Sequence, residues 1–345
     1  MGLPKDCSLK LHSKWPSGKR NLITDVPGVK VGHVTLKEGE INTGVTAVLP
    51  HPGNMFKEKV MAGSAVINGF GKSIGLVQVE ELGTIETPII MTNTLSVGTA
   101  ATGLVKYMLG ENPDIGVDTG TVNCLVTECN DGRLNDIRGL HVREEHVTQA
   151  IENAAEDFEE GAVGGGTGMI CFGFKGGIGS ASRIIPADGK DYTIGSIVMS
   201  NFGSFGNLVV GGDRIGERIK RQVEEQNGEE KDKGSIIIII GTDIPLSERQ
   251  LNRLSRRAAL ALGRVGSYSG NGSGDIAISF TTANRIMHYS ENSVTDMKMF
   301  KDDDLDKVFE AAVEAVEEAI VSSLYHAETT TGFRGNTYKS LRAYL

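Results

Sequence analysis

Apolar and polar positions alternate along the chain between helical and extended periodicity. Apolar positions at helical spacing predict helices over residues 96–109, 144–158, 213–225, 246–262 and 305–324. Short apolar runs broken by Gly, Pro and Asn predict strands over residues 45–49, 65–67, 74–79, 89–92, 121–127, 168–174, 193–198, 235–241 and 276–280. Because strands and helices alternate without an internal repeat, the pattern indicates an α/β fold.

The most informative junction joins a charged segment to a run of isoleucines. Residues 224–233 are rich in Glu, Asp and Lys, which predicts an exposed loop. Gly234 and Ser235 follow, and residues 236–240 are all isoleucine, which suits a strand buried on both faces. The loop interrupts an otherwise continuous pattern, so we expect one α/β domain over residues 1–345 and no domain boundary here.

The adjacent residues Gly234 and Ser235 have two interpretations. Gly and Ser are common turn residues, so the pair is also what the simple end of a loop would contain. If the bond between them is cleaved, Ser235 becomes an N-terminal nucleophile, and its own α-amine can serve as the general base. Gly234 suits such a reaction because glycine leaves its carbonyl unhindered and tolerates a strained backbone.

Two other strand ends carry candidate catalytic side chains. Ser273 and Asp275 precede the strand predicted at 276–280, and an extended backbone would place their hydroxyl and carboxylate on one side. The Asn-Gly pair just before them is also typical of a simple turn. Asn201 follows the strand predicted at 193–198, where it is either a turn residue or a side-chain NH₂ donor to an oxyanion.

The sequence indicates no cofactor and no metal. The glycine run at residues 164–166 leads into a predicted strand and lacks the Lys of a P-loop, so we expect no nucleotide. Cys124 and Cys129 have neither the spacing nor the nearby His pair of a zinc site. The histidines form no HExxH motif, and no Gly-x-Ser-x-Gly elbow accompanies an obvious Asp–His pair.

Composition and charge exclude several classes of protein. The net charge of −9 argues against a nucleic-acid partner, which would need a basic surface. No apolar stretch reaches the roughly 18 residues of a membrane span, and residues 1–20 lack the apolar core of a secretory signal. Four cysteines in so long a chain, without a signal peptide, suggest reduced thiols, so we expect a cytoplasmic protein.

Motifs spread over nearly the whole chain resemble one family of enzymes. In order they read ITDVPGV, TNT, LND, VGGGTGM, FKGGIG, TDIPL and GSGDI, at residues 23–29, 92–94, 134–136, 163–169, 174–179, 242–246 and 272–276. They resemble the L-aminopeptidase/D-esterase family, peptidase family S58, which includes the β-peptidyl aminopeptidases.

The resemblance implies a fold and an activity. The fold would be a four-layer α-β-β-α sandwich like that of N-terminal nucleophile hydrolases, with a different connectivity. The chain would cleave itself before Ser235 into residues 1–234 and 235–345, which stay together. It would then remove N-terminal residues from short peptides, amides or esters, as a homotetramer and without a cofactor.

The resemblance also implies roles for individual residues. Ser235 matches the nucleophile and Asn201 the oxyanion donor, while Ser273 and Asp275 match the pair that orients the nucleophile. Studied members carry Glu where Asp275 stands, and Asp keeps the charge with a shorter reach. They carry an active-site Tyr where Asn130 stands, so we expect Asn130 to contact the substrate with a shorter side chain.

Two alternatives remain open from the sequence. An acyltransferase of the ornithine acetyltransferase type also cleaves itself, although normally at a Thr, which the serine at position 235 disfavours. The other alternative is an inactive member of the fold that never cleaves, and Asn130 is the only support for it.

Overall fold

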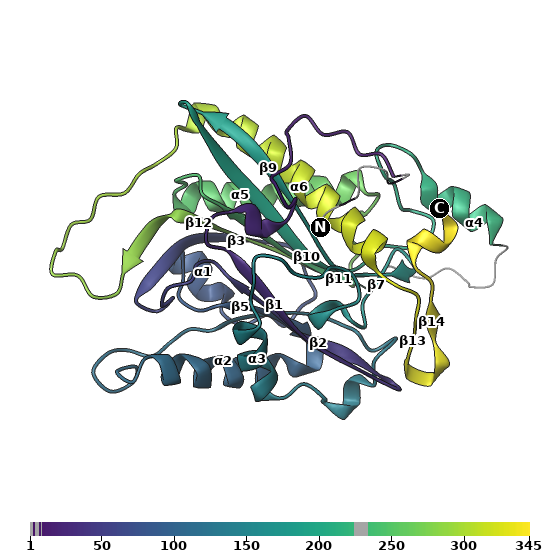
Figure 1. The fold of residues 1–345 in the computed structure, drawn as a ribbon, viewed down its shortest axis with the longest axis horizontal. Coiled ribbons are helices and arrows are strands. Elements are labelled where there is room, and N and C mark those ends of the chain that lie inside the picture. Colours follow the sequence, from purple (N-terminus) through teal and green to yellow (C-terminus); the bar gives the residue numbers. More distant parts are fainter. Residues whose placement is uncertain (1–2, 4–6, 8, 224–233) are drawn as a thin grey trace.

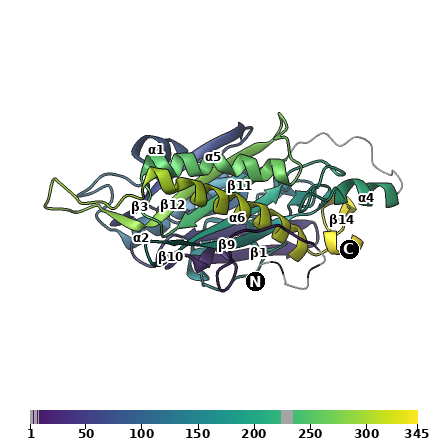
Figure 2. The same ribbon diagram turned by 90° about the horizontal axis from the view of Figure 1, so that it is seen from above.

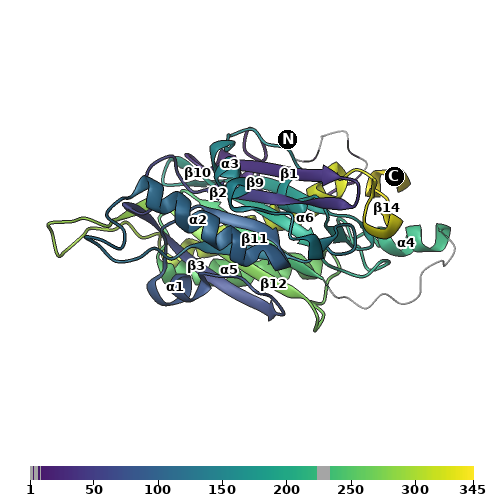
Figure 3. The ribbon, with the colours of Figure 1, turned by 90° about the horizontal axis from the view of Figure 1, so that it is seen from below.

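Two β-sheets lie face to face in the middle of the molecule, and helices cover both outer faces (Figure 1). The structure is a computed structural model and describes residues 3, 7, 9–223 and 234–345. Seen from above, α5 (Glu248–Arg264) and α6 (Leu305–His326) cover one sheet (Figure 2). Seen from below, α2 (Val97–Glu111) and α3 (Glu144–Glu152) cover the other (Figure 3). The predicted α-β-β-α sandwich is therefore confirmed.

The larger sheet contains six strands in the order β4-β3-β12-β11-β10-β9. The central strands β11 and β12 are parallel, and β10 and β3 pair with them antiparallel on either side. The strands are β3 (Glu58–Gly69), β4 (Thr84–Ile85), β9 (Gly177–Ala187), β10 (Lys190–Asn201), β11 (Ser235–Thr242) and β12 (Gly274–Met287). The strand predicted from the isoleucine run is thus a central one.

The isoleucines of β11 are all fully buried because both faces of its sheet are covered. Ile236, Ile238 and Ile240 belong to the core under α5 and α6. Ile237 and Ile239 belong to the core between the two sheets. Since side chains alternate across a strand, Ser235 begins β11 on the face that looks toward the other sheet.

The smaller sheet contains four strands in the order β1-β2-β5-β6. They are β1 (Lys30–Glu38), β2 (Ile41–Leu49), β5 (Ile89–Asn93) and β6 (Leu125–Cys129). Its outer face packs against α2 and α3 through a third core, which includes Val45, Ile90, Leu104 and Val147. The last residues of β6 reach the end of the sandwich where β10 ends and β11 begins, so both sheets contribute to that end.

The short elements lie around the sandwich. Two hairpins lie beside the end of the larger sheet. One pairs β7 (Ile170–Cys171) with β8 (Phe174–Lys175), and the other pairs β13 (Thr330–Thr331) with β14 (Thr337–Tyr338). The helix α4 (Ile215–Gln222) replaces the longer one predicted at 213–225. The loop predicted at 224–233 lies outside the described residues. Within the described ranges, no helix is long and apolar enough to span a membrane.

Four further predicted elements were wrong or too long. The strand predicted at 74–79 is the helix α1 (Leu76–Leu82), because Gly75, with a φ of 93°, turns the chain before it. The strand predicted at 168–174 is the β7–β8 hairpin, with positive φ at Phe172 and Gly173. The helix predicted at 144–158 ends at Glu152, and the strand predicted at 121–127 begins at Leu125.

The edge strand β9 was not predicted. Its sequence, GIGSASRIIPA, is rich in Gly and Ser, which have low strand propensity. It forms because β10 pairs with it along almost its whole length and α6 packs across it.

Candidate active site

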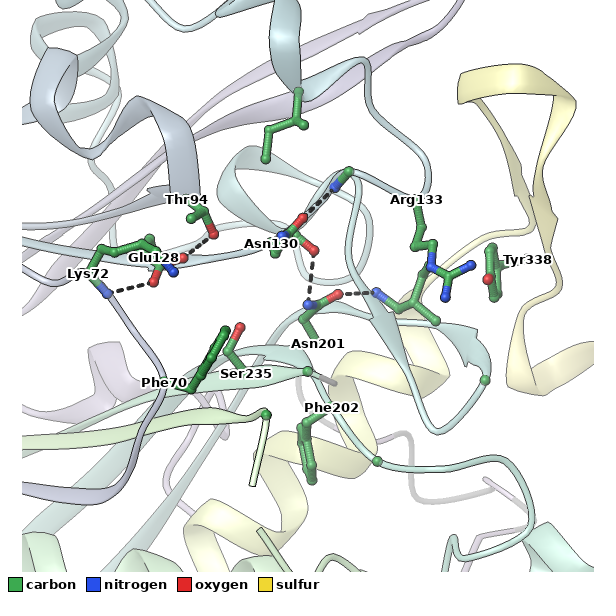
Figure 4. Close-up of a pocket in the computed structure, with 17 residues that line it drawn as sticks. Phe70, Lys72, Thr94, Glu128, Asn130, Arg133, Asn201, Phe202, Ser235 and Tyr338 are labelled. Atoms are coloured by element: carbon green, nitrogen blue, oxygen red, sulfur yellow. Dashed lines mark hydrogen bonds between the residues drawn. The ribbon is translucent and has the colours of Figure 1, made fainter. Parts of the chain in front are cut away.

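A pocket of about 700 Å³ opens at the end of the sandwich where the two sheets meet (Figure 4). On one side, β6 contributes Glu128 and the turn after it contributes Asn130, and on the other side the larger sheet contributes Asn201 and Ser235. The predicted nucleophile, oxyanion donor and substrate contact therefore lie in one cavity, although their positions in the sequence are far apart.

Ser235 is the first residue of β11 and lies between two neighbouring strands. It pairs with Asn201 across the antiparallel β10 and with Gly274 across the parallel β12. Its side chain lines the pocket and is largely buried. The Gly274 N–H donates to the Gly234 carbonyl oxygen at 3.2 Å. The carbonyl before Ser235 is thus already polarised by a backbone donor.

Gly234 is held in a space that only glycine fits. A Cβ at this position would lie 2.2 Å from the Asn201 carbonyl oxygen and 2.5 Å from the Phe202 Cα atom. Both neighbours are backbone atoms of the same strand end, so they cannot swing away as a flexible side chain could. The sequence suggested glycine for its permissive backbone, and the structure adds a steric reason.

Ser273 and Asp275 form the hydroxyl–carboxylate pair that their spacing predicted. The Ser273 hydroxyl donates to Asp275 Oδ1 at 2.5 Å, and both side chains are fully buried. Gly274 lies between them and pairs with Ser235, so the two residues flank the strand neighbour of the predicted nucleophile. They are not among the residues that line the pocket, so they lie behind its wall.

Two hydrogen bonds fix the orientation of the Asn201 side chain. Its Nδ2 donates to the Asn130 carbonyl oxygen at 3.0 Å, and its Oδ1 accepts from the Ile170 N–H at 2.9 Å. An amide NH₂ has two N–H donors, so Asn201 can hold Asn130 and donate to a bound oxyanion at the same time.

Asn130 lies on the pocket wall in a tight turn. Its side-chain Oδ1 accepts from the Gly132 N–H at 2.9 Å, and its backbone carbonyl accepts from Asn201. The structure therefore gives Asn130 a second task that the sequence did not predict, which is to hold Asn201 in place.

Glu128 was missed by the sequence analysis and is the buried carboxylate of the pocket. Oε1 accepts from the Lys72 N–H at 2.9 Å, and Oε2 accepts from the Thr94 hydroxyl (Figure 4). Only 4% of the residue is exposed, yet it lines the cavity. The available signal was a glutamate in the mostly apolar run LVTEC, where burial of a carboxylate requires a specific reason.

The thiol of Cys129 donates to the Met199 carbonyl oxygen at 3.5 Å and interacts with the Ser235 side chain. Burial, followed by the negative charge of Glu128, raises the pKa of this thiol well above its usual value. Cys129 therefore stays protonated. Because only the thiolate is a good nucleophile, Ser235 is the stronger candidate for the nucleophile of the site.

The opposite rim of the pocket carries an aromatic and a basic group. Arg133 follows the turn after β6, and Tyr338 lies on β14 beside it (Figure 4). In the described part of the chain, no group of three or more His, Cys, Asp or Glu side chains is placed to hold a metal ion.

The fold consists of two packed sheets with covering helices, and a serine stands at the head of a central strand. These features define a variant of the N-terminal nucleophile hydrolase fold. The sequence model of peptidase family S58 matches residues 21–338, and the chain belongs to this family. It is a hydrolase, an aminopeptidase of that family, so the acyltransferase alternative is wrong.

Similar proteins are known from sequence and from structure. The β-peptidyl aminopeptidase BapA of Sphingosinicella microcystinivorans is 41% identical over 94% of this chain and 86% of its own. The PH0078 protein of Pyrococcus horikoshii is 55% identical, with a TM-score of 0.92 over 97% of this chain and 94% of its own. The L-aminopeptidase D-Ala-esterase/amidase of Ochrobactrum anthropi is 37% identical, with a TM-score of 0.89 over 96% and 93%.

Proposed function

We propose that the chain becomes a mature aminopeptidase by cleaving its own bond between Gly234 and Ser235. The mature enzyme would release N-terminal residues from short peptides, amides and esters. The observation that carries the proposal is the position of Ser235, at the head of a central strand in the pocket, between Asn201 and Gly274.

Self-cleavage would proceed by an N-to-O acyl shift. The Ser235 hydroxyl attacks the Gly234 carbonyl carbon, the C–N bond breaks, and the serine nitrogen takes up a proton as the free amine. Water then hydrolyses the resulting ester and leaves the Gly234 carboxylate. Two features support this step, namely the Gly274 N–H on the carbonyl oxygen at 3.2 Å and the steric requirement for glycine.

The two fragments would stay together after cleavage. The strands of residues 235–345 in the larger sheet, β11 and β12, lie between β10 and β3, which belong to residues 1–234. Both outer edges of this central pair are therefore hydrogen-bonded to the first fragment. Separating the fragments would break two antiparallel ladders and expose the isoleucine core.

Hydrolysis would use the same hydroxyl with a different carbonyl. The α-amine of Ser235 accepts the hydroxyl proton, the hydroxyl oxygen attacks the substrate carbonyl, and Asn201 Nδ2 donates to the oxyanion. The leaving amine or alcohol takes the proton, and water cleaves the acyl-serine ester. Behind the pocket wall, the Ser273 hydroxyl donates a hydrogen bond of 2.5 Å to Asp275, and this pair orients the strand end that presents Ser235.

Glu128 is the group we propose for recognition of the substrate's free amine. Its carboxylate lines the pocket on the side of Ser235 opposite Arg133, whereas Asp275 does not line it. A buried carboxylate with fixed hydrogen bonds attracts an ammonium strongly because little solvent screens it. An N-terminal residue, α- or β-linked, would place its amine here. A homotetramer and a cytoplasmic location remain part of the proposal.

Mass spectrometry of the purified protein tests the proposal directly. Intact masses should correspond to residues 1–234 and 235–345, and N-terminal sequencing of the second fragment should read Ser-Ile-Ile-Ile. A Ser235→Ala variant should remain one chain without aminopeptidase activity. Cleavage at another bond, or an active uncleaved chain, would contradict the role of Ser235. An uncleaved, inactive wild-type chain would favour the inactive alternative.

A further inference from the structure

A fully buried lysine lies beside the pocket wall, on the short strand β8. The ammonium of Lys175 donates to the carbonyl oxygens of Gly166, Met169 and Gly176 at 3.1, 2.8 and 2.7 Å. An ammonium has three N–H donors, so three carbonyls satisfy it completely. Burying such a charge costs free energy, and lysine is almost never fully buried without a partner. Lys175 therefore needs a reason to be there.

One of its acceptors belongs to a peptide unit that reaches the candidate oxyanion donor. The Met169 carbonyl accepts from Lys175, and the N–H of the same peptide unit, on Ile170, donates to Asn201 Oδ1 at 2.9 Å. Asn201 Nδ2 is the group that faces the pocket beside Ser235. A positive charge is thus connected to Asn201 through one backbone amide.

We propose that Lys175 is a positioning residue that acts on Asn201 through the peptide unit joining Met169 and Ile170. Lys175 holds this peptide so that its N–H fixes the Asn201 amide with Nδ2 toward the substrate. Its charge polarises the peptide, which polarises the Asn201 amide in turn and makes Nδ2 a stronger donor. Chains of hydrogen bonds strengthen each other by roughly 10–30% per bond. The inference rests on the proposed role of Asn201 in hydrolysis.

The charged groups around Lys175 are compatible with this role. Burial, followed by the charge of Lys37, lowers the pKa of Lys175, while Asp131 and Cys171 oppose that change and the three carbonyl acceptors favour the ammonium form. Asp131 is itself buried and accepts from the Asn135 side-chain amide at 3.0 Å.

A double-mutant cycle on the mature enzyme tests the inference. Lys175→Met, Asn201→Ala and the double variant are compared for kcat and KM on an aminoacyl p-nitroanilide, after self-cleavage has gone to completion. Loss of an oxyanion donor lowers kcat by about 10²–10³-fold, so Asn201→Ala should reach that range and Lys175→Met about 10-fold. KM should change little, and the double variant should be no slower than Asn201→Ala alone.

Thr167→Val is the matched control. Its hydroxyl donates to the Gly164 carbonyl at 2.6 Å in the same loop and has no bond to the peptide unit of Ile170. This variant should lower the melting temperature and leave kcat unchanged. If Lys175→Met does not fold, Lys175→Gln keeps two N–H donors without the charge and should show the same non-additivity with Asn201→Ala.

The outcomes distinguish the inferred role of Lys175 from the proposed role of Asn201. Multiplicative losses in the double variant, an unchanged kcat in Lys175→Met, or an equal loss in Thr167→Val would each overturn the role of Lys175 and leave Asn201 intact. Wild-type kcat in Asn201→Ala would instead overturn the proposed role of Asn201, and the inference with it.

Discussion

Ser235 and Asn201 face each other as the terminal pair of two antiparallel strands, β11 and β10. The pairing fixes the distance between a hydroxyl and an amide donor through the geometry of the sheet itself. Strand pairing positions both residues. A reaction at this pair would therefore use a preformed arrangement, which is what electrostatic stabilisation of an oxyanion requires.

The first prediction concerns the pair behind the pocket wall. Asp275→Asn removes the negative charge while keeping an acceptor for the Ser273 hydroxyl, so the fold should persist. We expect kcat to fall about 10–100-fold, no more than the lower limit of the roughly 10²–10⁴-fold that a general acid–base group contributes, because Asp275 acts through Ser273 and the strand end. Steady-state kinetics with circular dichroism as a folding control measures this. An unchanged kcat would return Ser273 and Asp275 to the role of an ordinary strand-entry turn.

The sequence predicted the central features of the fold because they depend on local pattern. Five consecutive isoleucines required burial on both faces, and β11 is a central strand. The stripe of apolar residues in α6 likewise predicted its length almost correctly. β9 was missed because its stability comes from pairing with β10 and from α6, and neither contact is visible in its own Gly- and Ser-rich sequence.

The residues of the candidate site also fall into two groups, those that the local sequence marked and those that only the folded structure revealed. Ser235, Ser273 and Asp275 were found because a short motif or spacing marked them. Glu128 and Lys175 were missed as functional candidates because their meaning depends on contacts across the chain. Glu128 binds the backbone of Lys72, and Lys175 reaches Asn201 only through the folded β7–β8 hairpin. The sequence pattern alone cannot reveal contacts between segments that are far apart in the chain.

A second prediction concerns stability at acid pH. Burial lowers the pKa of His33 from 6.5 to about 4, and the hydrogen bond to the Glu159 carbonyl opposes this change only in part. The folded state therefore binds fewer protons than the unfolded state between these values. This contribution is complete above pH 6.5 and is lost as the pH falls toward 4. It should be at most about 3.5 kcal/mol, since one pKa unit corresponds to about 1.4 kcal/mol.

Urea unfolding at a series of pH values between about 4 and 7 measures this loss, a range set to span the ordinary histidine pKa. His33→Gln, which cannot titrate, is the control, and its free energy of unfolding should depend less on pH over the same interval. Parallel curves for the two proteins would show that His33 is not the group responsible.

A third prediction concerns the pH dependence of activity. The α-amine of mature Ser235 must be neutral to accept the hydroxyl proton, so kcat should rise with pH. The midpoint should lie near the usual α-amine pKa of about 7.7–8. Chemical modification of the α-amine by mild acylation should abolish turnover. A flat profile between about pH 6 and 9, which brackets that pKa, would contradict the assignment of the general base.

The last prediction concerns recognition of the substrate's amine by Glu128. Glu128→Gln removes the charge but keeps an oxygen for the Lys72 N–H and a polar partner for the Thr94 hydroxyl. A charge-assisted hydrogen bond contributes about 1.5–3 kcal/mol, so kcat/KM for an aminoacyl p-nitroanilide should fall about 10–150-fold. The N-acetyl form of the same substrate carries no ammonium. It should be turned over poorly by the wild type and should lose nothing further in the variant. The ratio of kcat/KM between the two substrates therefore isolates the effect of the charge.

Asp275→Asn is the matched control, because its carboxylate lies outside the pocket and its loss should leave that ratio unchanged. If Glu128→Gln slows both substrates equally while Asp275→Asn changes the ratio, the amine is recognised by Asp275 and not by Glu128.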